Sequence, residues 1–245
     1  MKYYPNNKTA NYITHLPKSI DLQNGQWEMA LVEVHYPCSF LTIGKNEYIY
    51  IYVQDKGHTP ANPKTKLIPI KVNTGDYRTM DELVETLNHD YTMKDYATFM
   101  YDKASKTVDL AIRSHVEQIE LSPTLSLQMG YNPNEDNLKE HKKAIRPANI
   151  SLGLPAHMFV YCDLVEPQLV GDTVAPLLKI VNMDTTDYQY GAQKTVHYTN
   201  PHYVPLIKNT FENVEIDLRD HTGRLLPFHF GTTNVKLHFR RAQQQ

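Results

Sequence analysis

The sequence predicts a mainly β protein, an antiparallel sandwich or jelly roll that carries one small α+β insertion. Its 245 residues include 17 tyrosines and 15 prolines. Aromatic residues favour strands, and proline is typical of the connections between short strands. Segments with the two-residue alternation of strands recur up to residue 56 and again after residue 133, whereas the clear helix signals lie between them. Many short strands at regular spacing are typical of sandwiches and jelly rolls.

The first part of the chain is expected to form three strands, over 12–22, 27–36 and 48–53. Asn24-Gly25 predicts a tight turn between the first two. In the second strand the apolar side chains lie on one face from Trp27 to Leu31 and on the opposite face at Val32 and Val34. A change of face within one strand predicts a β-bulge or cover on both sides.

The middle of the chain, residues 57–133, carries the helix signals and is expected to be an inserted α+β segment. After a proline-rich loop at 58–66 and a short strand at 68–72, Thr79 and Glu82 match a capping box. Ser122-Pro123 and Gly130 predict the start and the end of a second helix. The remaining elements are a helix stripe at Met80, Leu83, Val84 and Leu87, and a hairpin over 97–101 and 107–113.

The rest of the chain returns to strands after a polar loop at 132–147 whose charges nearly cancel. We therefore expect a discontinuous sandwich made of residues 1–56 and 134–245, interrupted by the insertion at 57–133. The C-terminal strands are expected at 157–165, 177–181, 195–198, 204–207, 214–219, 225–228 and 235–240.

Composition excludes several classes of protein. The formal net charge is −2, from 25 basic and 27 acidic side chains, which disfavours binding to nucleic acid by bulk electrostatics. No segment approaches the roughly 20 apolar residues of a membrane-spanning helix, and the polar start lacks the apolar centre of a signal peptide. The only cysteines, Cys38 and Cys162, are too few for a disulfide framework. We expect a chain made inside the cell, with two free thiols and no membrane span.

No recognisable pattern of catalytic or metal-binding residues occurs in the chain, so we expect neither an enzyme nor a cofactor. A cupin-type metal site needs two histidines one residue apart, whereas His197 and His202 stand five apart. Nucleophile elbows of the Gly-x-Ser-x-Gly type and glycine-rich phosphate loops are absent. Asp217 and Asp220 would suit a glycosidase only if they faced one substrate, and carboxylates near a turn usually cap it.

Several stretches resemble capsid proteins of the Polinton (Maverick) elements and the related adintoviruses. Near the N-terminus, Tyr3–Asn7, Trp27–Val34 and Tyr36-Pro37 are similar to the opening of that family. The likeness extends over most of the chain and is loosest across the insertion and the polar loop. Toward the C-terminus it is carried by Tyr161–Asp172, Ala175–Leu178, Phe211–Arg224, Pro227–Gly231 and Leu237–Arg241.

The resemblance implies the minor capsid protein, or penton, of such a particle. This would be a single jelly roll whose first and last strands lie side by side, forming homopentamers at the five-fold vertices of an icosahedral capsid. The implied partner is a double jelly-roll major capsid protein, and the implied location is the virion. The segment 57–133 would then project from the sandwich or lie at a subunit boundary.

Closing a ring of subunits calls for aromatic anchors, and the long loop at 184–205 is rich in them. Arg240 and Arg241 near the C-terminus either contact an anionic partner or keep an edge strand from pairing with other chains. A carbohydrate- or receptor-binding jelly roll, another minor capsid or cement protein, and a metal-dependent jelly-roll enzyme remain alternatives. The interface candidates are Tyr188, Tyr190, Tyr198, Tyr203, Arg240 and Arg241.

Overall fold

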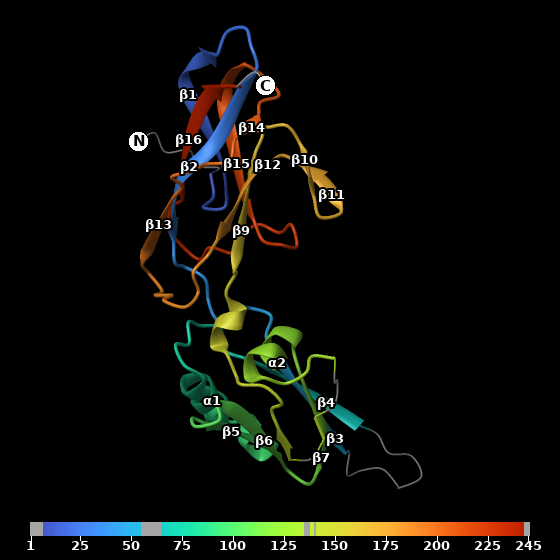
Figure 1. The fold of residues 1–245 in the computed structure, drawn as a ribbon. Coiled ribbons are helices and arrows are strands. Elements are labelled where there is room, and N and C mark those ends of the chain that lie inside the picture. Colours follow the sequence, from blue (N-terminus) through green and yellow to red (C-terminus); the bar gives the residue numbers. More distant parts are fainter. Residues whose placement is uncertain (1–6, 55–64, 135–137, 140, 243–245) are drawn as a thin grey trace. The chain divides into compact units, whose positions relative to one another are not determined.

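The computed structural model describes residues 7–54, 65–134, 138–139 and 141–242. The proline-rich loop at 58–64 and the family-like residues before Asn7 lie outside this part of the chain. The fold is mainly β, as predicted, with 47% of the described residues in strands and 11% in helices. The chain divides into two units (Figure 1): a β unit made of Met1–Phe40 and Pro155–Gln245, and an insert unit made of Leu41–Leu154.

The β unit contains two antiparallel sheets and a separate hairpin. Sheet A has the strand order β1-β15-β9-β12, whereas in sheet B the central strand β2 pairs with β16 on one side and with β13 and β14 on the other. The bounds are β1 (Asn11–Asp21), β15 (Thr210–Arg219), β9 (His157–Cys162) and β12 (Leu177–Asn182) in sheet A; β2 (Trp27–Pro37), β16 (Asn234–Arg241), β13 (Gln193–His197) and β14 (Val204–Pro205) in sheet B; and β10 (Gln168–Val170) with β11 (Thr173–Ala175) in the hairpin.

The inner faces of the two sheets form the core of the β unit. Alternate side chains are buried along β9 and along β15 from Val214 onward, as a two-residue period requires. Phe211 of β15 stacks on Phe239 of β16, with ring centroids 5.7 Å apart, and thereby joins sheet A to sheet B. The buried side chains include Met29, Leu31 and Val34 on β2, Met158, Val160 and Cys162 on β9, and Val214, Ile216 and Leu218 on β15.

The predicted irregularity in the second strand is confirmed as a bulge. Glu33 of β2 lies opposite Lys236 of β16, but Leu31 lies opposite Leu237, so Val32 has no residue of its own across the ladder. The extra residue lets Leu31 and Val34 both face the core, although an odd number of positions separates them.

The implied adjacency of the first and last strands is wrong in detail. β1 pairs with β15 in sheet A, whereas β16 pairs with β2 in sheet B. The turn at Asn24-Gly25 therefore carries the chain from one sheet to the other and closes no hairpin. The expected strand at 225–228 is also wrong: it is reduced to one bridge between Arg219 and Leu225, since Pro227 has no N–H to donate to a ladder.

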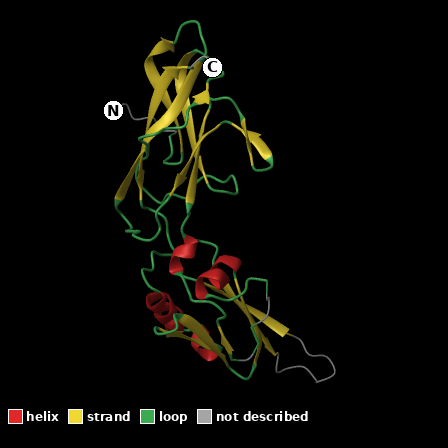
Figure 2. Ribbon diagram, in the orientation of Figure 1, coloured by secondary structure: helices red, strands yellow, loops and turns green. Residues whose placement is uncertain are grey.

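The insert unit holds the four helical segments of the described chain (Figure 2) and two small antiparallel sheets. One sheet has the order β4-β3-β7 and the other the order β5-β6-β8. The bounds are β3 (Tyr48–Gln54), β4 (Thr65–Lys71), β7 (Val116–Leu121), β5 (Ala97–Asp102), β6 (Thr107–Ile112), β8 (Lys142–Lys143), α1 (Met80–His89), α2 (Pro123–Met129) and the 3-10 turns η1 (Met93–Asp95) and η2 (Ile150–Gly153).

This unit is larger than the expected insertion at 57–133, at both ends. β3 pairs along its length with β4 and β7, so a strand assigned from sequence to the sandwich belongs to the insert core. At the other end, the Ala144 N–H donates to Val108 O, and Gln128 Nε2 donates to Ile150 O. The polar segment after residue 132 therefore returns to cover the insert core.

Both predicted helices are confirmed, with one change in the first cap. Thr79 accepts a hydrogen bond from the Glu82 N–H, but the Glu82 carboxylate accepts from Arg78 N at 2.8 Å and not from Thr79 N. At the end of α2, Gly130 adopts a φ of +84°. A Cβ on Gly130 would lie 2.1 Å from Arg146 O, so only glycine fits this close approach.

We expect Gly130→Ala to lower the free energy of unfolding by about 3 kcal/mol, measured by urea denaturation. The left-handed φ costs an alanine about 1–2 kcal/mol, and the clash with a backbone oxygen adds a similar amount. Gly223→Ala is the matched control, because Gly223 has a φ of +79° with open space around it. An equal loss in the two variants would contradict the role assigned to the Arg146 contact.

Candidate subunit interface

The loop between β12 and β13 is attached to the β unit by two tyrosines. The Tyr188 hydroxyl accepts a hydrogen bond from Phe40 N at 2.6 Å and donates one to Phe40 O at 2.7 Å. The Tyr190 hydroxyl lies 2.7 Å from Nδ1 of His229, and the Tyr190 ring meets the edge of Phe230 at 5.3 Å. Both hydroxyls therefore have partners within the chain, which makes these tyrosines anchors of their own loop.

Tyr203 and Arg240 form a stacked pair on sheet B. The Arg240 guanidinium lies 3.5 Å from the centre of the Tyr203 ring, and its Nε donates to Glu28 at 2.9 Å. The Tyr203 hydroxyl lies 2.7 Å from Nδ1 of His238. Strand pairing produces this group, because Arg240 lies opposite Glu28 in the ladder between β16 and β2.

The remaining two candidates lie in other surroundings. Tyr198 follows β13, and Lys179 of β12 lies over its ring at 4.8 Å. Arg241 is exposed, and its guanidinium lies 5.7 Å from the Trp27 ring. Of the six residues predicted from sequence, the structure thus shows only Tyr203 and Arg240 in contact with each other. Whether any of them contacts a neighbouring subunit stays a prediction.

A second polar cluster, centred on Glu33, lies on sheet B and was missed from sequence. His35 Nε2 lies 2.5 Å and His197 Nδ1 3.0 Å from the Glu33 carboxylate, with Lys236 Nζ at 3.9 Å. The hydrogen bond from His35, together with the charges of Lys236 and His197, holds the pKa of Glu33 below its usual range. Strand register brings His197 and Lys236 to Glu33, since Glu33 pairs with both, and His35 lies two residues along the same strand.

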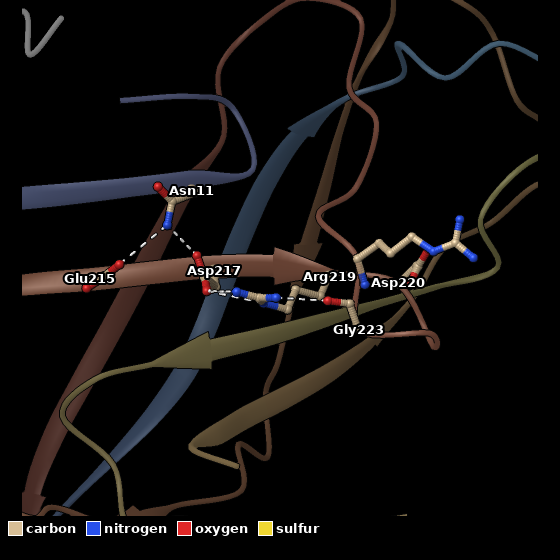
Figure 3. A network of polar contacts seen from close by, with 7 residues as sticks. Asn11, Glu215, Asp217, Arg219, Asp220 and Gly223 are labelled. Carbon is tan, nitrogen blue, oxygen red and sulfur yellow. Dashed lines mark hydrogen bonds and ion pairs between the residues drawn. The ribbon is translucent and has the colours of Figure 1, made fainter. Parts of the chain in front are cut away.

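The two aspartates weighed as a glycosidase pair have structural partners. Figure 3 shows Asp217 bound by Asn11 of β1 and by Arg219, whose Nη2 lies 2.6 Å from the carboxylate. Asp220 caps its own turn, accepting from the N–H groups of Thr222 and Arg224 at 2.8 and 3.1 Å. The bond between Asn11 and Asp217 ties β1 to β15, and the bonds to Asp220 close the turn that follows β15.

Neither cysteine is placed to act as a reactive thiolate, and the described residues form no metal centre. Cys38 and Cys162 are free and buried, and burial raises the pKa of the Cys162 thiol to about 12. No group of three or more His, Cys, Asp or Glu side chains in the described ranges is placed to hold a metal ion. No helix in the same ranges is long and apolar enough to cross a membrane.

Two further features of the β unit were not anticipated. A groove of about 910 Å³ runs along β1 and the chain entering β16, lined by residues 7–9, 12–17 and 231–234. The β10–β11 hairpin exposes Leu169 and Val174 to 78% and 65%. Gly171-Asp172 between two short runs of strand formers is the sequence signal that could have predicted the hairpin. The groove has no local signal, because its walls come from opposite ends of the chain.

Comparison with known proteins gives a match in fold. No protein-family model matches the chain. No curated protein sequence matches it. Among solved structures, the mavirus penton protein aligns over 96% of this chain and 92% of its own, with a TM-score of 0.50 and 11% identity. The chain shares the fold of the mavirus penton protein. A chain of the Sputnik virophage aligns over 98% of this chain and 96% of its own, with a TM-score of 0.45 and 13% identity.

We expect both native thiols to resist a thiol reagent such as DTNB at pH 8, because each side chain is buried and the thiolate is the reactive form. Burial also raises the pKa of the Cys38 thiol. In denaturant both thiols of each chain should react. Rapid labelling of the folded protein would contradict the burial of these residues.

We expect Arg240→Ala to lower the free energy of unfolding by about 1–2 kcal/mol, because it removes both the contact with Tyr203 and the bond to Glu28. Arg241→Ala, one residue along the same strand, should cost about 0.5 kcal/mol or less. Thermal or urea unfolding of the two variants measures the difference, and equal losses would argue against the stacked pair.

Proposed function

We propose that this protein is a penton, a minor capsid protein that forms homopentamers at the five-fold vertices of an icosahedral capsid. The supporting observation is the extent of the match to the mavirus penton protein. A sandwich alone occurs in proteins of many functions. Here the alignment covers 96% of this chain, and a segment as long as the insert unit cannot fall within the uncovered remainder. The alignment therefore includes both the β unit and the insert unit of this chain.

A structural role also suits the surface of the β unit. Its polar clusters are paired within the chain, whereas aliphatic side chains remain exposed on the β10–β11 hairpin and at Ile207, which is 55% exposed. Exposed aliphatic groups gain free energy when a neighbouring protein covers them. On this proposal the work of the protein is association, without catalysis, and its second partner is a double jelly-roll major capsid protein. The sequence likeness points to a particle of the Polinton or adintovirus type.

The native mass of the purified full-length chain tests the proposal. Five copies of a 28.3 kDa chain would give about 140 kDa, measured by native mass spectrometry or sedimentation. Class averages from electron microscopy should then show five-fold symmetry. A chain that stays monomeric at concentrations of about 100 μM, or that forms a closed dimer or trimer, would overturn the homopentamer.

A further inference from the structure

The β10–β11 hairpin is an isolated element of the β unit. Its two strands pair only with each other, and Leu169 lies directly opposite Val174. Figure 1 shows the hairpin standing away from the strands of the two sheets. A two-stranded hairpin is marginally stable in water, and both of its central aliphatic side chains are exposed. Cover from another protein surface would therefore stabilise the hairpin.

The groove along β1 has the matching character. Ile13, Leu16 and Pro17 give it an apolar wall, and β1 is an edge strand of sheet A. The pairing of β1 with β15 is interrupted between His15 and Ile20, so this stretch of the edge is irregular. Two hydrogen bonds fix the base of the groove: Thr9 Oγ1 donates to Gly231 O at 2.7 Å, and Thr233 Oγ1 donates to Thr9 O at 2.6 Å.

Charge complements the apolar match. Asp172 is exposed in the turn of the hairpin, and Lys8 is exposed at the groove. Neither side chain has a hydrogen-bond or ionic partner among the residues that the structure describes. An acidic turn that approaches a basic groove is attracted to it, whereas two like charges would be repelled.

The positions of the hairpin and the groove suit a head-to-tail contact. β1 and β12 are the two edges of sheet A, and the hairpin connects β9 to β12, so the groove and the hairpin belong to opposite edges. The groove and the hairpin also lie at the same height along the strands of sheet A. Tyr12 of the groove pairs with Ile216, and Ile216 pairs with Cys162, the last residue of β9 before the chain enters the hairpin. A contact between different surfaces at one level favours a closed ring over a rising helix.

We propose that the β10–β11 hairpin of one copy docks into the β1 groove of the next copy, and that this contact repeats around the ring. The inference rests on the proposed homopentamer and names the surfaces that would build it. Leu169 and Val174 contribute the apolar part of the contact, and Asp172 faces Lys8 of the neighbouring copy.

Cross-linking tests which surfaces meet. A chain carrying Asp172→Cys and Lys8→Cys, mildly oxidised, should give a ladder of up to five linked chains on a non-reducing gel. Each single variant should stay unlinked, because the native Cys38 and Cys162 are buried. Dimers from Asp172→Cys alone would mean that hairpin meets hairpin, which would overturn the proposal. The absence of a ladder from the double variant would overturn it as well.

Native mass tests the energetic contribution of the contact. Leu169→Ser with Val174→Ser should raise the concentration needed for half-assembly at least about tenfold. The melting curve of the unassembled chain should stay unchanged, because both side chains are exposed in the single chain. Ile145→Ser in the insert unit, where the side chain is 63% exposed, is the matched control and should assemble normally. Asp172→Lys should weaken assembly, and adding Lys8→Asp should restore it.

The outcomes separate this inference from the proposed function. A pentameric wild type whose hairpin variants also remain pentameric would overturn the hairpin–groove contact and leave the homopentamer intact. Equal loss of assembly in the Ile145→Ser control would likewise overturn it. A monomeric wild type would overturn both proposals.

Discussion

Burial of the facing sides of sheets A and B is the interaction on which the rest of the structure depends. Met29 and Leu31 of β2 and Met158 and Val160 of β9 are almost wholly excluded from solvent. Each such side chain contributes about 1.5–3 kcal/mol relative to exposure. This contact fixes the register of β2, β9 and β15, because a slip of one residue would turn their buried apolar side chains outward. It covers the faces of the sheets but leaves their edges open.

The polar clusters follow from that register. Glu28 meets Arg240, and Glu33 meets His197 and Lys236, because the ladders place these residues opposite one another. Two of the side chains chosen from sequence as interface anchors are also engaged within the chain: Tyr188 binds the backbone of Phe40, and Tyr203 stacks on Arg240. Internal hydrogen bonds therefore suffice to explain why this loop is rich in tyrosine.

Local patterns predicted the local structure well. The caps at Thr79 and Gly130, the alternation along β15 and the bulge near Val32 each depend on a few neighbouring residues, and all are present. The boundaries of the insert unit were missed because the place of β3 is decided by its pairing with β7, far along the chain. The groove was missed for a related reason: it joins residues from both ends of the sequence.

The two ends of the insert unit meet within that unit, and this bears on how the chain folds. Gly153 lies so close to Thr42 that a Cβ would be 2.0 Å from Thr42 O, and Gln128 Nε2 donates both to that oxygen and to Ile150 O. β2 must find β13, β14 and β16 across the whole insertion, and closing such a long loop costs entropy. An insert unit that folds first converts this long loop into a short one. In that order of folding, the insert unit would speed the pairing of β2 with β13, β14 and β16, which are the most distant pairings in the sequence.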